Sequence, residues 1–411
     1  MKIVIDTNII GLAQLYETAR TGIFRVISNL AEELLRRRHL DVSFCSLSSI
    51  EVNRLTDSYF AERALSERAF GRNAVERLVD GLAGDNLAAN RQSFGVKVLS
   101  KCHRLSQTWR IGRSADIFHS MYSALPRFSR SGKPIRMMTI YDIIPLIHPE
   151  YFADGFVDQF RPIVESLSAE EDFVFTISEC SKNDICSYFQ MDPDRVFVAP
   201  PAASSELYYP VHDREHIHEV RKRFQIPEGP YFLTLATVEK RKNLETSLRC
   251  FRRLLHEPGC RDLSFVLVGV RGWKVEEFID EIDSDPLLRK RVVFTGFVPD
   301  RYLSALYSGA VGFVYPSLYE GFGLPPLEAM QCGLPVITSA TSSLPEVVAD
   351  AGIMVDPLDK DGITQAMLSL LTDPQHRQKL IDKGLERAKY FSWQRCGDQT
   401  EAGYRTAWES R

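Results

Sequence analysis

Short apolar runs alternate with segments of helical periodicity along all 411 residues of this chain. Runs of this kind are typical of parallel strands that are buried on both faces of a sheet. Their alternation with helices predicts an α/β fold. Six runs fall in the first half of the chain, at 3–6, 42–47, 117–120, 137–142, 173–178 and 196–200. Six more fall in the second half, at 231–237, 265–270, 292–296, 312–317, 335–339 and 352–356.

Length and turn residues divide the chain into two domains. A chain of 411 residues is longer than one hydrophobic core ordinarily holds. Turn-forming residues follow the last run of the first half and precede the first run of the second half. We predict an N-terminal domain of residues 1–205, a C-terminal domain of residues 206–390 and a final segment, 391–411. The cleft between the domains is the default ligand site.

Charge argues against nucleic acid as a partner, because the net charge is −4 and phosphate binding needs a basic surface. One region is nevertheless basic, since between residues 86 and 136 ten lysines and arginines face the single acid Asp116. This region is either a solvated basic face or a surface for an anionic membrane or a lipid diphosphate.

The remaining composition points to a globular cytoplasmic protein. The chain contains 24 Phe and 15 Tyr, which excludes a disordered chain, and its eight cysteines lack a CxxC pair and are expected to be free thiols. No apolar run is long enough to span a bilayer, and the N-terminus leads directly into a strand without a signal-peptide pattern. We expect a cytoplasmic protein, with a peripheral position on the inner face of the plasma membrane as the alternative.

The most informative stretch is 316–333, which predicts a strand, a glycine loop and a helix in succession. Gly321 and Gly323 leave backbone N–H groups unshielded beside a helix N-terminus, where they can bind a phosphate or a sugar hydroxyl. Glu320 is expected at the mouth of the loop and Glu328 in the first helical turn, where both can accept hydrogen bonds from hydroxyl groups. The stretch therefore predicts a site for a hydroxyl-rich, phosphate-bearing ligand, the alternative being a glycine turn with two solvated glutamates.

Two further segments can contact an anion. Arg241 and Lys242 follow the first strand of the second domain, and an open α/β sheet binds ligands beyond the carboxyl ends of its strands. Gly22 leads into a helix and can expose N–H groups there, although a plain turn fits the residues equally well. Neither loop contains GxGxxG, which argues against a nicotinamide-dependent dehydrogenase.

The spacing of Glu320 and Glu328 within PSLYEGFGLPPLEAMQCGLPVITS resembles the signature of retaining glycosyltransferase family 4. The segment EKRKNL at 239–244 resembles the diphosphate-binding segment of that family. Segments of the first half resemble members that build bacterial surface polysaccharides, including O-antigen mannosyltransferases. These segments are Arg20-Thr21-Gly22-Ile23, DIFHS at 116–120, DIIP at 142–145 and SECS at 178–181.

The resemblance implies a GT-B fold, in which two Rossmann-like domains face a cleft and a C-terminal helix returns to the first domain. Trp393, Tyr404 and Trp408 would anchor that helix. The second domain would hold the nucleotide sugar and the first domain the acceptor.

The resemblance also implies residue roles. Glu320, Lys242, Arg241 and Asp142 would be catalytic, with the two cations stabilising the departing diphosphate. Glu328 would accept hydrogen bonds from the ribose hydroxyls. The other donor-binding residues would lie in loops that follow strands or lead into helices, namely Gly22, Thr237, Gly321, Phe322, Gly323 and Leu324.

Two positions depart from the family pattern. Tyr141 stands where many members carry a histidine near the reaction centre, and Ala236-Thr237 replaces a Gly-Arg pair. No acidic DxD-type motif lies beside the phosphate residues, so we predict a metal-independent enzyme without a cofactor. The nearby His119 and His148 are read as core or surface side chains.

The sequence thus predicts a retaining, nucleoside-diphosphate-sugar-dependent glycosyltransferase that acts on a lipid-linked or growing glycan acceptor. GDP-mannose is the leading donor, followed by UDP-hexoses and dTDP-rhamnose. An epimerase or hydrolase on the same fold is one alternative, and a non-catalytic sugar-binding subunit is another.

Overall fold

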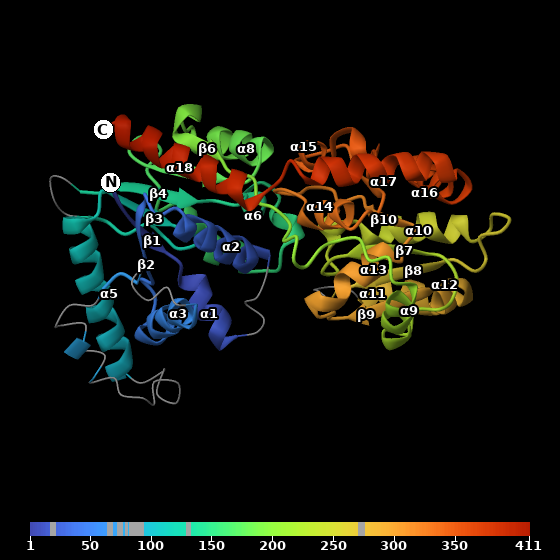
Figure 1. The fold of residues 1–411 in the computed structure, drawn as a ribbon, viewed down its shortest axis with the longest axis horizontal. Coiled ribbons are helices and arrows are strands. Elements are labelled where there is room, and N and C mark those ends of the chain that lie inside the picture. Colours follow the sequence, from blue (N-terminus) through green and yellow to red (C-terminus); the bar gives the residue numbers. More distant parts are fainter. Residues whose placement is uncertain are drawn as a thin grey trace.

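A computed structural model describes residues 1–16, 22–63, 69–71, 77, 78, 81, 94–128, 133–269 and 276–411. Its strands form two parallel sheets of six strands each, which lie one after the other along the long axis of the molecule (Figure 1). The predicted α/β architecture with two parallel sheets is confirmed.

The first sheet has the strand order β2-β1-β3-β4-β5-β6. In β1, Ile3 and Ile5 belong to one buried cluster and Val4 to the cluster on the opposite face, so both faces of the strand are apolar. The strands are β1 (Lys2–Asp6), β2 (Asp41–Cys45), β3 (Ile117–Ser120), β4 (Ile135–Thr139), β5 (Phe173–Thr176) and β6 (Val196–Val198). The helices are α1 (Asn8–Leu15), α2 (Gly22–Arg36), α3 (Ile50–Glu62), α5 (Phe94–Ser114), α6 (Ile144–Ile147), α7 (Phe156–Val164) and α8 (Glu179–Phe189).

The second sheet has the order β12-β11-β10-β7-β8-β9. Its strands are β7 (Tyr231–Leu235), β8 (Ser264–Val268), β9 (Val292–Gly296), β10 (Gly312–Tyr315), β11 (Val336–Ser339) and β12 (Ile353–Val355). The helices are α9 (Arg214–Arg223), α10 (Leu244–Leu254), α11 (Glu276–Ser284), α12 (Pro286–Arg291), α13 (Leu303–Ser308), α14 (Leu324–Gln331), α15 (Leu344–Val348), α16 (Lys360–Thr372) and α17 (Pro374–Ala388).

Several strands end two or three residues before the predicted boundary. Strand β4 ends at Thr139, β7 at Leu235 and β10 at Tyr315, rather than at 142, 237 and 317. The residues beyond each strand end form loops at the carboxyl edge of a sheet, where parallel α/β proteins bind ligands. Asp142 and Thr237 are therefore loop residues and not strand residues.

Helix α18 (Trp393–Glu409) follows the second domain but lies on the first, against α2, β5 and β6. Figure 1 shows it in red above the blue-to-green half of the molecule. Tyr404 is fully buried, and its hydroxyl lies 2.7 Å from Nδ1 of His119. Trp408 is 36% exposed, so the expectation that it anchors the helix is wrong.

His119 on β3 is a core side chain, held between Tyr404 and the hydroxyl of Thr139, which lies 2.8 Å from its Nε2. Burial lowers its pKa to about 3. A histidine in the unfolded chain has a pKa near 6.5, so below this pH unfolding takes up a proton that the folded protein does not bind. The contribution of His119 to the free energy of unfolding is therefore expected to fall by up to about 2 kcal/mol between pH 6.5 and pH 5.

Chemical denaturation at both pH values checks this expectation. His119→Gln keeps hydrogen-bonding groups but cannot titrate, so its stability should change less with pH than that of the wild type. The matched control is His256→Gln at an exposed position, which should retain the wild-type pH dependence. Equal pH dependence in His119→Gln and the wild type would refute the assignment.

Two compositional expectations can be compared with the structure. All eight cysteines are free thiols, as predicted. Among the helices of the described residues, none is both long and apolar enough to cross a membrane.

Candidate active site

A cavity of about 630 Å³ lies between the two domains. Every residue that the sequence singled out for catalysis or donor binding lines it, from both domains. These residues are Gly22, Asp142, Thr237, Arg241, Lys242, Glu320, Gly321, Phe322, Gly323, Leu324 and Glu328. The cavity thus brings together groups that are up to 306 positions apart in the chain, from Gly22 to Glu328.

The segment that carries Arg241 and Lys242 is fixed by its backbone. A short 3-10 turn, Lys240–Lys242, follows β7 and ends at Asn243, whose φ is 55°. The amide Nδ2 of Asn243 donates to the carbonyl oxygens of Pro316 and Pro357 at 3.0 and 2.7 Å. These contacts hold the two cations beside the loop after β10.

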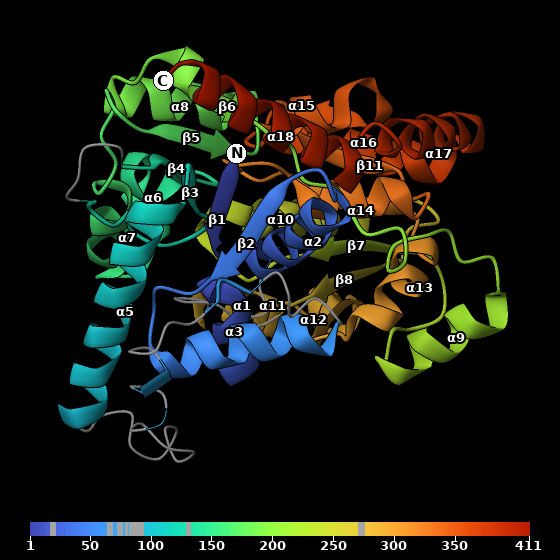
Figure 2. The same cartoon turned by 60° about the vertical axis from the view of Figure 1, so that its left-hand side comes forward.

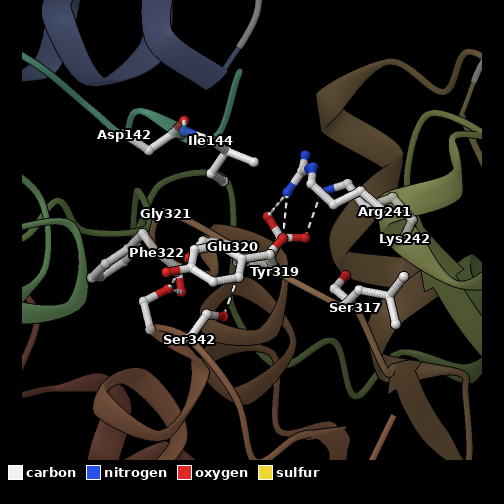
Figure 3. A network of polar contacts seen from close by, with 12 residues as sticks. Asp142, Ile144, Arg241, Lys242, Ser317, Tyr319, Glu320, Gly321, Phe322 and Ser342 are labelled. Carbon is white, nitrogen blue, oxygen red and sulfur yellow. Dashed lines mark hydrogen bonds and ion pairs between the residues drawn. The ribbon is translucent and has the colours of Figure 1, made fainter. Parts of the chain in front are cut away.

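Glu320 forms the centre of a buried ion cluster (Figure 3). Its Oε2 accepts from Nη1 of Arg241 at 2.5 Å and its Oε1 from Nζ of Lys242 at 2.7 Å. Lys242 also donates to the hydroxyl of Tyr315 at 2.6 Å, and Arg241 to Oε1 of Glu239 at 2.7 Å. Glu320 directly precedes the glycine loop and is only 7% exposed, so it is a buried group and not a solvated glutamate.

The cluster fixes the charge of Glu320. Burial alone would raise the pKa of Glu320, but Arg241 and Lys242 outweigh it and lower this pKa to about 2. Burial raises the pKa of the nearby Asp142 above its ordinary value. Glu320 is therefore an ionised acceptor at neutral pH and has no proton to donate.

The glycine loop requires its glycines. A Cβ at Gly321 would lie 2.7 Å from Oδ2 of Asp142, so only glycine allows the loop and the first domain to approach this closely. Gly323 has a φ of 131°, which side chains other than glycine rarely adopt. The hydroxyl groups of Ser178 and Ser181 donate to the carbonyl oxygen of Gly321 at 2.7 and 3.2 Å. First-domain residues therefore hold the loop in place.

The sequence predicts Glu328 in the first turn of the helix. In the structure it lies in the second turn of α14. The residue is 5% exposed, and its carboxylate accepts a hydrogen bond from the hydroxyl of Tyr307 at 3.0 Å. Nη1 of Arg25, on α2 of the first domain, lies 3.7 Å from its Oε1. Glu320 and Glu328 thus share the cavity but have different partners.

Several functional contacts were missed by sequence reasoning. Arg25 lies three positions after Gly22, and this short spacing is the one available signal. Glu346 accepts hydrogen bonds from the backbone N–H groups of Glu179 and Cys180 at 2.8 and 2.7 Å, which joins the second domain to the start of α8. No local pattern marks this second contact, because the partners are more than 160 positions apart.

The residues that depart from the family pattern can also be placed. Tyr141 lines the cavity and is half-buried, and Thr237 is exposed at the cavity wall. His148 packs against Tyr319, with ring centroids 4.9 Å apart, and is not among the residues that line the cavity.

No group of three or more His, Cys, Asp or Glu residues that could hold a metal ion occurs in the described part of the chain.

The fold and the cleft define a two-domain glycosyltransferase of the GT-B type. The profile of the family "Glycosyl transferases group 1" matches residues 216–387. O-antigen chain mannosyltransferase B of Escherichia coli is 35% identical over 320 residues, which are 77% of this chain and 81% of that protein. The chain belongs to this glycosyltransferase family, and the predicted resemblance is confirmed.

Two further proteins show the extent of the similarity. The serotype-specific mannosyltransferase WbdA of Escherichia coli is 34% identical over 257 residues, which are 62% of this chain and 31% of that protein. The solved structure of sucrose-phosphate synthase from Thermosynechococcus elongatus has a TM-score of 0.65 at 19% identity, covering 100% of this chain and 99% of that one. The latter similarity supports the two-domain fold.

Proposed function

We propose that this protein transfers mannose from GDP-mannose, with retention of configuration, to a lipid-linked or growing glycan acceptor during surface polysaccharide synthesis. The observation that carries the proposal is the cluster of Glu320, Arg241 and Lys242 beside the glycine loop, in a cleft that also holds Glu328. The choice of mannose rests on the names of the two relatives from Escherichia coli.

The cleft offers a partner for each charged part of such a donor. An ammonium group has three N–H donors, and Lys242 directs two of them to Glu320 and Tyr315, which leaves one for a phosphate oxygen. The loop that leads into α14 adds the backbone N–H groups of residues 321–324, and the helix adds a favourable dipole, whereas Pro325 and Pro326 in its first turn have no N–H to donate. Glu328 would accept hydrogen bonds from the ribose hydroxyls.

Transfer breaks the bond between the anomeric carbon and the diphosphate and forms a bond from that carbon to an acceptor oxygen. Negative charge then grows on the departing diphosphate, and fixed cations in a dry site stabilise it. Because Glu320 is ionised, we propose that the departing phosphate takes the acceptor proton on the same face of the sugar. Asp142 would orient a hydroxyl group of the donor or the acceptor.

A thermal-unfolding panel of GDP, UDP, dTDP and ADP tests the donor class. A nucleotide at ~100 times its dissociation constant stabilises a protein by roughly 2.7 kcal/mol, so the nucleotide with the matching base should give the largest rise in the unfolding temperature. GDP is the expected responder, and stabilisation by UDP or dTDP alone would reject GDP-mannose. Product analysis by NMR with a mannose-terminated lipid-linked acceptor should then show an α-linkage. Release of free mannose without acceptor as the main reaction would support the hydrolase alternative.

We further propose that transfer requires no metal ion. Two cations and a helix N-terminus lie beside the place proposed for the diphosphate, and we expect their N–H groups and the helix dipole to stabilise it in place of a divalent ion. Activity in EDTA is expected to stay within about twofold of the untreated enzyme. Complete loss in EDTA that magnesium or manganese restores would contradict this expectation.

Helix α5 is proposed as a contact for an anionic membrane surface. It lies on the outer side of the first domain, at the left of Figure 2. Its solvent-facing residues combine basic side chains with the exposed Leu105 and Trp109, each 59% exposed, a pattern that suits a negatively charged lipid interface. The exposed basic residues are Lys97, Lys101, Arg104 and Arg113.

Two other basic residues of the 86–136 region pair with acidic residues of the first domain instead. Lys133 pairs with Glu171 at 2.6 Å, and Arg136 donates to both carboxylate oxygens of Asp172. Arg91 and Arg130 lie outside the described residues.

Co-sedimentation with phosphatidylglycerol vesicles tests the α5 surface. The double variant Lys101→Glu and Arg104→Glu is expected to lose most vesicle binding, while Lys133→Glu should bind as the wild type does. Equal binding by the wild type to neutral vesicles, or no effect of the double variant, would contradict the proposal.

A further inference from the structure

Arg25 reaches across the cleft from the first domain to the second. It lies in the first turn of α2, and its Nη2 donates to Oδ1 of Asp300 at 2.5 Å. Its Nη1 donates to the hydroxyl of Tyr208 at 2.9 Å and lies 3.7 Å from Oε1 of Glu328. One guanidinium group therefore joins α2 to three positions of the second half of the chain.

The surroundings of Glu328 explain why a cation matters there. The side chain of Glu328 is 6% exposed, whereas that of Arg25 is 34% exposed, so a buried carboxylate faces a half-buried cation. Burial raises the pKa of Glu328, and the carboxylate of Asp300 acts in the same direction. Arg25 opposes both effects, and the hydroxyls of Tyr208 and Tyr307 also favour the ionised form. The thiol of Cys332 is a further titratable neighbour of Glu328.

We infer that Arg25 is a positioning residue that keeps the ribose-binding carboxylate of Glu328 charged and oriented from the opposite domain. The inference rests on the proposed function, because it assigns Glu328 to the donor ribose. An ionised carboxylate accepts hydrogen bonds from two hydroxyls more strongly than a neutral acid does. Donor binding therefore depends on a residue of the first domain.

This arrangement makes donor affinity depend on the distance between the domains. Arg25 and Glu328 lie on opposite sides of the cleft, so any opening of the cleft removes the cation from the carboxylate. The ribose site is then complete only when the two domains are close together, as they are in this structure.

Calorimetric titration with GDP between pH 5.5 and 8.5 tests the role of Arg25. Arg25→Gln removes the charge but keeps hydrogen-bonding groups, and it should weaken GDP binding about tenfold at pH 7. Because Glu328 would then hold a proton at lower pH, the loss should be larger at pH 5.5 and smaller at pH 8.5. Arg25→Lys keeps the charge and should restore the pH profile of the wild type.

Two comparisons make the test specific. Arg36→Gln lies on the same helix at an exposed position and should bind GDP as the wild type does. In a double-mutant cycle, Arg25→Gln should have little further effect once Glu328→Gln is present.

Unchanged or tighter GDP binding in Arg25→Gln would overturn the inference, as would a loss that is equal at every pH. Should Arg25→Gln fail to fold, GDP binding by Arg25→Lys is measured over the same pH range, and a profile steeper than that of the wild type would also overturn the inference. Failure of the proposed function has a different signature, since the wild type itself would then bind neither GDP nor another nucleoside diphosphate from the panel.

Discussion

Lys242→Ala is expected to lower kcat by at least about 100-fold, because it removes a cation aimed at the place where the departing diphosphate gains charge. The ammonium is held by Glu320 and Tyr315 at 2.7 and 2.6 Å, so it is already oriented before a donor binds. A hydrogen-bonding cation that is already oriented in a water-excluding site stabilises the transition state more than the ground state. The effect should therefore appear mainly in kcat, with a smaller rise in the donor KM.

The same substitution also affects stability. Glu320 loses one of its two cations but keeps Arg241 at 2.5 Å, so the free energy of unfolding should fall by about 1 to 3 kcal/mol rather than collapse. Thermal unfolding of the variant shows whether it is folded at the assay temperature. Lys240→Ala is the matched control, because Lys240 lies two positions earlier in the same turn and is exposed. Near wild-type kcat in a folded Lys242→Ala variant would remove Lys242 from the catalytic assignment.

Glu328→Gln is expected to weaken GDP binding by about 10- to 100-fold, because a charged acceptor of two ribose hydroxyls becomes a neutral amide. The substitution leaves the size of the buried side chain nearly unchanged, so the fold should persist. Donor KM should rise more than kcat falls, since the ribose is far from the bond that breaks. Calorimetry with GDP and steady-state kinetics with GDP-mannose measure the two effects.

A matched control for Glu328→Gln is Glu245→Gln in the first turn of α10, where the side chain is 60% exposed. This variant should bind GDP with wild-type affinity. If Glu328→Gln also binds GDP with wild-type affinity, the ribose assignment of Glu328 is wrong, and so is the inference on Arg25.

The sequence predicted the parts of the site that depend on local pattern. Strands β7 and β10 are apolar over several residues, and the glycine loop after β10 is marked by Gly321, Gly323 and the spacing of Glu320 and Glu328. Because parallel strands place their carboxyl ends at one edge, these segments had to converge in a cleft. Their family resemblance supplied the residue roles.

What the sequence did not predict depends on contacts between distant segments. Glu320 was expected at the mouth of the glycine loop, but its ion pairs were not predicted, because Arg241 and Lys242 lie 79 and 78 positions away in the chain. Arg25 has no motif of its own, since its partner Asp300 lies 275 positions away. The ends of strands β4 and β7 were also predicted too late in the chain. Asp142 and Thr237 each follow apolar residues, and no turn-forming residue stands between the strand and either of them.

The most direct test of this account is a crystal structure of the protein with GDP bound. The account predicts that the ribose hydroxyls contact the carboxylate of Glu328 and that the terminal phosphate lies within hydrogen-bond distance of Nζ of Lys242, in the cleft between the domains. A nucleotide bound outside this cleft, or one whose phosphates lie away from both Lys242 and the glycine loop, would contradict it.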